Sequence, residues 1–387
     1  MDNPTKKQGL GFLCLSHAWG GLEIHVVNLT RWLAERGWRV YLFAYPGTPL
    51  YRKAMETGIN VIAVKSKFRY GDIINARKLA GHIKRHGIGF MTVHRSPDIL
   101  IAVLAKILSQ SRFRLIYSQH MHIGIKRDLF HSWEYRHFDA WITPLKLLAE
   151  QTRQNTNLGE EIIHVVAQGI ELDRFLENRF TGDSARAELN LPKEEIIVGL
   201  IGRLDPQKGQ MTLVRALPRI HKAGFKVHVL FVGEPTRGEH ADFRKRLEEN
   251  LRANRLRDYV HFRPFQENPA RVYAATDIFT LASYSETYGL VTIEAMASGL
   301  PVIGTRSGGT QEIIEEGKTG LLFNPRSHEK LAEGIITLLE NPPLRQKLAR
   351  NARLKARERY SHEVQVREWE RIITELSSQD HSQKTKT

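Results

Sequence analysis

Short apolar segments alternate with helical patterns along this chain of 387 residues, and the alternation starts again near residue 195. Strands followed in turn by helices are typical of a parallel, doubly wound sheet. The strand-like segments are apolar at successive positions, as expected when helices cover both faces of a sheet. The sequence therefore predicts an α/β chain with two Rossmann-like domains. The expected strands lie at residues 11–16, 40–44, 61–64, 90–93, 115–118, 195–201, 227–232, 260–263, 278–281, 301–304 and 320–323.

The boundary between the two domains is expected near Gln168 and Gly169, where a strand-like segment ends. After the second array the chain has the apolar spacing of a terminal helix, and its last eleven residues are polar. Polar chain ends of this kind commonly fray. The predicted organisation is a first domain over 1–168, a second domain over 169–362, a terminal helix over 363–376 and a flexible tail over 377–387.

Composition narrows the class of protein. A single cysteine, Cys14, excludes a disulfide framework and a zinc site built from cysteines, and it fits a reducing, cytoplasmic setting. The longest uninterrupted apolar run, 99–105, is far shorter than the roughly 20 residues of a membrane-spanning helix. Lysine and arginine outnumber aspartate and glutamate by 57 to 42, which gives a net charge of +15. Such an excess suggests nucleic acid, an anionic membrane surface or an acidic substrate as a partner.

Two loops that follow strands could hold an anion. Gly20 and Gly21 stand between the first strand and the first helix, where the lack of side chains lets a ligand approach backbone N–H groups. The dinucleotide fingerprint G-x-G-x-x-G is absent, and a plain tight turn explains this pair equally well. In the second array, Arg203 and Lys208 lie in the loop 202–209, where they could bind phosphate or be solvated surface cations.

The most informative segment runs from Glu286 to Glu294, two carboxylates eight residues apart. Glu286 lies in a turn after a strand, and Glu294 is expected about two turns into an apolar helix. A carboxylate there is costly unless it is paired or faces a cleft. The amides of 288–290, at the start of that helix, could bind pyrophosphate. With a further glycine loop at 304–312, these loops predict a ligand site beyond the carboxyl ends of the strands, in a cleft between two facing domains.

Taken together, these loops resemble the family 4 glycosyltransferases, which are retaining, nucleotide-sugar-dependent enzymes of the GT-B fold. The resemblance runs from about residue 10 to about residue 375 and is strongest over 199–323. It implies an acceptor-side first domain, a donor-side second domain and a terminal helix that returns to the first domain. One departure is Gln168, where the family usually has asparagine. The residues that carry the resemblance are Gly20-Gly21-x-Glu23, Arg203 with Lys208, Glu286-x7-Glu294 and Gly308-Gly309-x-x-Glu312.

The resemblance also implies roles for individual residues. Those expected to bind the donor are Gly20, Gly21, Arg203, Lys208, Glu286, Tyr288, Gly289, Leu290 and Glu294. Those expected to act in catalysis are Glu286, His120, Arg203 and Lys208. Those expected on the acceptor side are His94, Arg95 and His122.

Within this set, Arg203 and Lys208 would neutralise the departing diphosphate. Glu286 would contact the transferred sugar, and Glu294 would accept hydrogen bonds from the ribose hydroxyls. His120 matches a family histidine near the sugar. His122 is its rival, because the segment reads Gln-His-Met-His.

Glycosyl transfer separates a sugar with developing positive charge from a leaving group with growing negative charge. Cations and helix amides placed on the diphosphate would lower the barrier. The chain contains no Asp-x-Asp pair, which favours a mechanism without a metal or other cofactor. Glu286 is a candidate nucleophile for a double displacement, but the resemblance favours front-face attack with Glu286 positioning the sugar.

The expected reaction moves a hexose from a UDP-sugar or GDP-sugar to a saccharide or lipid-linked acceptor, in lipopolysaccharide or cell-surface polysaccharide assembly. A nucleotide-sugar 2-epimerase or a phosphorylase on a similar fold is the alternative. A basic nucleic-acid-binding protein is less favoured, because no recognised binding motif is present. The sequence leaves open the sugar, the base, the acceptor and its linkage, the oligomeric state, and the choice between His120 and His122.

The positive charge is uneven along the chain. Residues 1–168 carry a net charge of +11, and residues 169–387 carry only +4. The positive charge of residues 1–168, the half expected to bind the acceptor, is more than the binding of a donor diphosphate needs. The first domain is therefore expected to bind an anionic acceptor or to attach peripherally to the inner face of the cytoplasmic membrane. The basic residues closest together are Lys65, Lys67, Arg69, Arg77, Lys78, Lys84 and Arg85.

Overall fold

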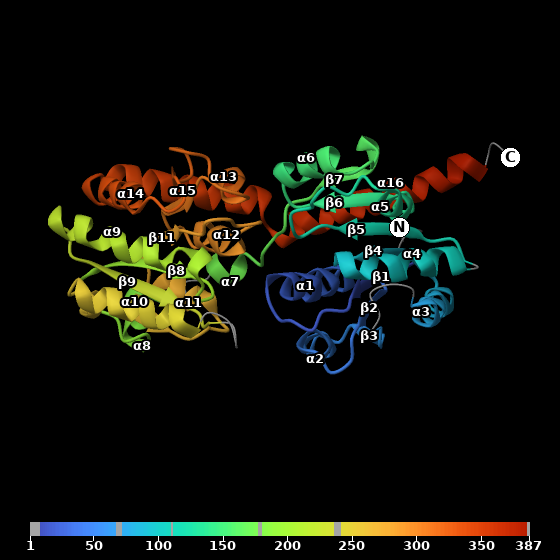
Figure 1. Ribbon diagram of the computed structural model, residues 1–387, viewed down its shortest axis with the longest axis horizontal. Helices are drawn as coiled ribbons and strands as arrows, with labels where there is room; N and C mark the ends of the chain where they lie inside the picture. Colours follow the sequence, from blue (N-terminus) through green and yellow to red (C-terminus); the bar gives the residue numbers. More distant parts are fainter. Residues whose placement is uncertain (1–7, 67–71, 110, 177–179, 236–240, 385–387) are drawn as a thin grey trace. The chain divides into compact units, whose positions relative to one another are not determined.

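Two parallel sheets organise the chain, as the alternation of strands and helices predicts (Figure 1). The computed structural model describes residues 8–66, 72–109, 111–176, 180–235 and 241–384. The first sheet has seven strands in the order β3-β2-β1-β4-β5-β6-β7, and the second has six in the order β10-β9-β8-β11-β12-β13. The strands of each sheet lie between helices (Figure 1), which explains why their residues are apolar on both faces.

The first compact unit contains the residues up to Gln168 together with those from His362 onward. Its strands are β1 (Gly9–Cys14), β2 (Val40–Ala44), β3 (Asn60–Ala63), β4 (Ile88–Val93), β5 (Arg114–Ser118), β6 (Ala140–Thr143) and β7 (Ile163–Val165). Its helices are α1 (Gly21–Glu35), α2 (Pro49–Glu56), α3 (Ile73–Arg85), α4 (Ile99–Leu108), α5 (Leu129–Tyr135), α6 (Lys146–Asn155) and α16 (His362–Lys384).

The second compact unit is Gly169–Ser361. Its strands are β8 (Ile196–Ile201), β9 (Val227–Val232), β10 (Val260–Arg263), β11 (Ile278–Leu281), β12 (Val302–Thr305) and β13 (Leu321–Phe323). Its helices are α7 (Asp173–Leu176), α8 (Gly182–Glu188), α9 (Gln210–Lys222), α10 (Ala241–Ala253), α11 (Pro269–Ala274), α12 (Leu290–Ala297), α13 (Thr310–Ile313), α14 (His328–Glu340) and α15 (Pro342–Arg359).

Helix α16 belongs to the core of the first unit although it ends the chain. Trp369 and Ile373 are buried in one cluster with residues of α1 and β1. On the surface of the same contact, Arg36 Nη2 lies 2.8 Å from Glu370 Oε2. The apolar spacing of the C-terminal segment therefore buries its stripe against the first helix of the chain.

The end of the chain differs from the expectation. A helix was expected over 363–376 with a flexible tail after it, but α16 continues to Lys384. The polar residues after Leu376 include neither glycine nor proline, so nothing in them breaks the helical hydrogen bonds. The Ser377 hydroxyl donates to the Ile373 carbonyl oxygen at 2.8 Å, within the helix.

The first strand also begins earlier than its apolar pattern indicates. Strand β1 is Gly9–Cys14 rather than 11–16, because Leu10 pairs with Val40 of β2. Leu15 has left the ladder, and its N–H donates to the buried Asp98 carboxylate at 2.9 Å. Of the basic residues grouped above, Lys67 and Arg69 lie outside the described residues. Among the helices that the structure describes, none is both long and apolar enough to cross a bilayer.

Close backbone contacts in the second unit depend on glycine. Gly209, at the N-terminus of α9, has a φ of +75°, and a Cβ there would lie 2.0 Å from the Ala282 carbonyl oxygen. Gly308 has a φ of +54°, and a Cβ there would lie 2.0 Å from the Glu286 carbonyl oxygen. These contacts bring the loops after β8 and β12 against the loop after β11.

Gly209→Ala is expected to destabilise the second unit by about 3 kcal/mol or more, because left-handed strain and a backbone collision add together. Gly224→Ala is the matched control. Gly224 has a φ of +91°, but a Cβ there would have no atom of the described residues within 4 Å, so strain alone should cost about 1 kcal/mol. Calorimetric melting of both variants checks this. Equal losses would show that the contact with Ala282 does not constrain the loop.

Candidate active site

The residues predicted from the sequence cluster at the points where strand order reverses. In the first sheet, β1 pairs with β2 on one side and β4 on the other. In the second sheet, β8 pairs with β9 and β11 in the same way. Loops diverge at such switch points and leave room for a ligand beyond the carboxyl ends of the strands. The loops there carry Gly20 and Gly21 after β1, His94 and Arg95 after β4, Arg203 and Lys208 after β8, and Glu286 after β11.

The centre of the second unit's site is an ion pair. Lys208 Nζ lies 2.7 Å from Glu286 Oε2, and both side chains are half-buried. The Ser283 hydroxyl donates to the same carboxylate oxygen at 3.2 Å. One oxygen of the Glu286 carboxylate is therefore held by both a cation and a hydroxyl. The structure thus brings together two residues that are 78 positions apart. The sequence predicts that Lys208 binds the diphosphate of the donor and that Glu286 contacts its sugar.

Backbone hydrogen bonds brace the loops around this pair. Tyr284 N–H donates to the Gln207 carbonyl oxygen at 2.8 Å, which ties the β11 loop to the β8 loop. Gly309 N–H donates to the Glu286 carbonyl oxygen at 2.8 Å, which ties the β12 loop to the same segment. A ligand at this edge would therefore meet a preformed rim rather than three independent loops.

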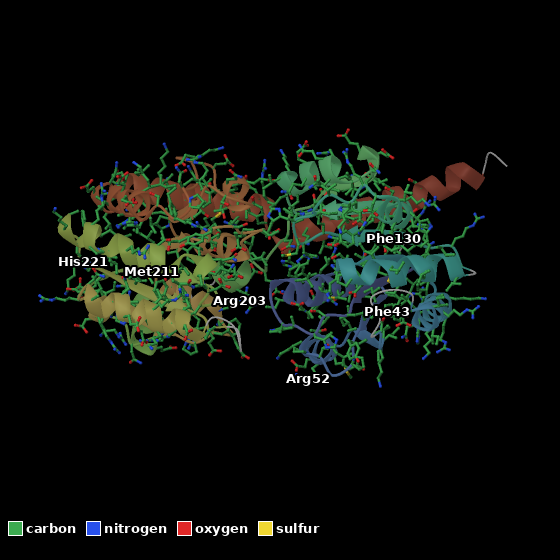
Figure 2. All side chains as sticks on the ribbon, in the orientation of Figure 1. Phe43, Arg52, Phe130, Arg203, Met211 and His221 are labelled. Carbon is green, nitrogen blue, oxygen red and sulfur yellow. The ribbon has the colours of Figure 1, made fainter. Side chains whose placement is uncertain are left out.

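Arg203 extends from the loop after β8 and is exposed (Figure 2). Its Nη2 atom lies 3.9 Å from Asp205 Oδ2, a weak pair. The backbone of this residue is better fixed, because the Gln210 amide donates to the Arg203 carbonyl oxygen at 2.7 Å. The side chain is thus carried by a backbone that is held in place.

Glu294 lies in a less polar place than Glu286. It is the fifth residue of α12, one turn into the helix rather than the expected two. Burial raises the pKa of its carboxyl group, and the hydrogen bond from Tyr273 and the charge of Arg174 partly offset this. The Tyr273 hydroxyl donates to Glu294 Oε2 at 2.7 Å. One carboxylate oxygen is thus engaged, and the carboxylate keeps capacity for further donors.

The start of α12 has the geometry expected for anion binding. Gly289 caps the helix with a left-handed φ of +89°. The first amides of a helix have no acceptor within it, and the helix dipole favours negative charge there. Tyr288 and Gly289 are buried, and Leu290 is half-buried.

The glycine pair of the first unit stands at the start of α1. Gly20 is the N-cap in an extended conformation, and a Cβ on Gly21 would have none of the described atoms within 4 Å. Glu23, in the first turn, is buried and accepts a hydrogen bond from the Ser16 hydroxyl at 2.5 Å. The helix therefore begins beside open space, as a site for a ligand requires.

Three histidines of the first unit, His25, His94 and His120, form a cluster beside the end of β5. His94 Nδ1 lies 3.1 Å from His120 Nε2, and the ring centroids of His25 and His120 are 5.2 Å apart. Burial lowers the pKa of His120 to about 4 and holds the pKa values of His25 and His94 well below the usual range. All three rings are therefore neutral at pH 7.

The other residues predicted for the acceptor side make different contacts. His122 is exposed, and its Nδ1 lies 2.8 Å from Gln151 Oε1. Arg95 Nη1 lies 3.4 Å from Asp98 Oδ1, and burial raises the pKa of Asp98 to about 6. Of the two rival histidines, only His120 joins the buried cluster.

Sequence reasoning missed several partners of these residues. Tyr273 is 21 positions from Glu294, so no local spacing connects them. His25 and Gln365 are 340 positions apart and yet lie 3.4 Å from each other, nitrogen to nitrogen. Only Ser283, three residues before Glu286, carries a signal that local spacing could have supplied. Within the described ranges, no group of three histidine, cysteine, aspartate or glutamate side chains is arranged to hold a metal ion.

Comparisons with known proteins agree with this geometry. Two sequence families match: the one described as Glycosyltransferase Family 4 over residues 19–174, and Glycosyl transferases group 1 over residues 182–355. The D-inositol 3-phosphate glycosyltransferase of Corynebacterium urealyticum is 24% identical over 364 residues, 86% of this chain and 85% of that protein. Its namesake in Mycobacteroides abscessus is 37% identical over 205 residues, 52% of this chain but only 44% of that protein.

Among solved structures, HepE of Anabaena in complex with UDP has a TM-score of 0.85 at 20% identity and covers 95% of this chain and 100% of its own. Another structure of the same protein contains UDP-glucose. At this identity the likeness shows a shared fold, the two-domain α/β architecture of GT-B glycosyltransferases. The matches to both halves and the fold lead to one conclusion: the chain belongs to the family 4 glycosyltransferases of group 1.

Proposed function

We propose that this glycosyltransferase moves a hexose from a UDP-sugar to a saccharide or lipid-linked acceptor with retention of anomeric configuration and without a metal. The observation that carries the proposal is the Lys208–Glu286 pair. Its two atoms lie 2.7 Å apart at the carboxyl ends of β8 and β11, where the second sheet reverses strand order. The binding of UDP and UDP-glucose by HepE, a structural neighbour, supports a uridine donor.

The charges of the second unit suit a diphosphate leaving group. Lys208 and Arg203 come from one loop, and the start of α12 adds the positive end of a helix dipole. Preorganised donors at developing negative charge lower the barrier without reorganisation. Lys208, Arg203 and the start of α12 would here neutralise the charge of the leaving diphosphate, as a divalent cation does in other transferases. Glu286 is already paired, so we assign it to holding sugar hydroxyls, and the leaving phosphate accepts the acceptor's proton.

The acceptor is proposed to carry negative charge or to sit at an anionic surface. The first unit holds most of the chain's positive excess, and the named acceptor of two relatives is an inositol phosphate. An acceptor in lipopolysaccharide or cell-surface polysaccharide assembly fits the same charge.

Lys208→Ala and Glu286→Ala are each expected to lower transfer from UDP-glucose by about 100-fold or more, because each removes a group that acts on the diphosphate or the sugar. Lys208→Ala should also weaken UDP binding in calorimetric titration. Lys226→Ala is the control, since Lys226 pairs with Glu195 at the amino ends of β8 and β9, the ends opposite to the candidate site. Near-normal turnover in folded Lys208→Ala would contradict the assignment.

Retention and metal independence are tested on the product and by chelation. Proton NMR of the first-formed glycoside is expected to show the α anomer when UDP-α-glucose is the donor. Excess EDTA should leave the rate within twofold, because Arg203 and Lys208 carry the charge neutralisation. A β product, or loss of activity that Mg²⁺ restores, would refute the corresponding part of the proposal.

A membrane-facing surface is proposed on the first unit, where apolar and basic side chains are exposed together. Ile74, in the first turn of α3, is 71% exposed and precedes the exposed Arg77 and Lys78. Leu129, at the start of α5, is 91% exposed and lies two positions after the exposed Arg127, with Asp128 between them. Its neighbour Phe130 is also exposed (Figure 2). Apolar side chains flanked by cations are typical of surfaces that lie on anionic bilayers.

The double variant Ile74→Ser/Leu129→Ser is expected to lose at least tenfold in binding to phosphatidylglycerol vesicles, because both side chains would leave the acyl boundary. Sedimentation with the vesicles measures this. Phe265→Ser is the control, since Phe265 is 63% exposed but belongs to the second unit. Hydrolysis of UDP-glucose should be unchanged in both. Equal vesicle binding by the double variant and wild type would exclude this surface.

A further inference from the structure

A hydrogen-bond chain leads from Gln168 into the histidine cluster. Gln168 is the last residue of the first unit before the chain passes to the second, and its Nε2 lies 3.0 Å from His120 Nδ1. An amide nitrogen carries two hydrogens and can only donate. His120 Nδ1 must therefore accept this bond, and it carries no proton.

The rest of the chain follows from the neutrality of the rings. A neutral imidazole has one ring proton, so that of His120 is on Nε2. This nitrogen lies 3.1 Å from His94 Nδ1 and 3.3 Å from the Ser118 hydroxyl oxygen. His94 Nδ1 then accepts, and the single proton of His94 is on Nε2. Among the described residues this buried nitrogen has no hydrogen-bond partner.

The direction of donation therefore runs from Gln168 through His120 to a donor at His94 Nε2 that the described part of the protein leaves unsatisfied. A buried N–H without an acceptor costs free energy. A buried water molecule that accepted from it would recover that cost.

We propose that Gln168 is a positioning residue that fixes His120 in its Nε2–H tautomer and thereby makes the buried His94 Nε2 the donor at the end of the chain. The expected effect on transfer rests on the proposed function. The part that concerns the tautomer does not, because it needs no substrate. His120 acts in this arrangement as a link with both ring nitrogens engaged, not as a carrier of protons.

A second glutamine contacts the cluster from the segment where the chain returns to the first unit. Gln365, the fourth residue of α16, places its Nε2 3.4 Å from His25 Nε2. His25, Ser118, Gln168 and Gln365 line one cavity of about 10 Å³, room for one water molecule. The side-chain amides of Gln168 and Gln365, which lie near the two points where the chain passes between the units, thus contact the same cluster.

The test reads the tautomer directly. Long-range proton–nitrogen NMR spectra of protein labelled with ¹⁵N-histidine distinguish a protonated from a bare ring nitrogen, and His120→Asn identifies the signals of His120. In the wild type at pH 8, His120 should be protonated on Nε2 only. In Gln168→Glu the proton should move to Nδ1, because a carboxylate accepts where the amide donates. In Gln168→Leu both tautomers should appear.

Gln151→Leu provides the control, since Gln151 also contacts a histidine Nδ1, but it does so through its amide oxygen and at the exposed His122. It should change His122 and leave His120 as in the wild type. In transfer assays, Gln168→Leu should raise KM for the acceptor at least fivefold and leave UDP affinity unchanged. A wild-type His120 protonated on Nδ1, or a His120 pattern unchanged in Gln168→Glu, would overturn the proposal. If the tautomers respond but no transfer occurs in the wild type, the proposed function fails instead.

Discussion

The ion pair between Lys208 and Glu286 is the contact on which the second unit's site depends. It joins the loop after β8 to the loop after β11 at 2.7 Å, and these loops can approach closely because Gly209 has no side chain. Gly308 permits the same close approach of the loop after β12 to Glu286. A half-buried pair of this kind is costly to break on one side only, since the remaining charge would keep its desolvation penalty. The pair therefore keeps a cation and a carboxylate in place before any ligand arrives, which is the condition for electrostatic catalysis.

The first unit organises its polar groups by the opposite means. Burial holds His25, His94 and His120 neutral, so their contacts are hydrogen bonds between uncharged rings and amides. Such a chain has a direction, because each neutral ring donates once and accepts once. The two units thus differ in their polar chemistry: the second holds a charged pair, which we propose acts near a diphosphate, and the first holds a chain of oriented neutral groups.

The surface of the first unit combines positive charge with exposed apolar side chains. Its excess of positive charge coincides with exposed apolar side chains on α3 and at the start of α5. The proposed contact with a membrane would explain why these exposed apolar side chains, which give the folded protein no stability in water, lie near cations. An anionic lipid surface would satisfy both kinds of side chain and would bring a lipid-linked acceptor close to the unit that is proposed to bind it.

The sequence by itself determined the two arrays of strands, their boundary near Gln168, the loops that carry Arg203, Lys208 and Glu286, and the helix that carries Glu294, because apolar periodicity and glycine placement are local signals. It did not reveal that α16 extends to Lys384, or that Lys208 and Glu286 pair. Nor could it choose between His120 and His122, which differ by two positions but lie in a buried cluster and on the surface respectively. Tertiary structure decided the length of α16, the pairing of Lys208 with Glu286 and the burial of His120, because burial and contacts across hundreds of positions, such as that of Gln365 with His25, arise only when the sheets and helices have packed.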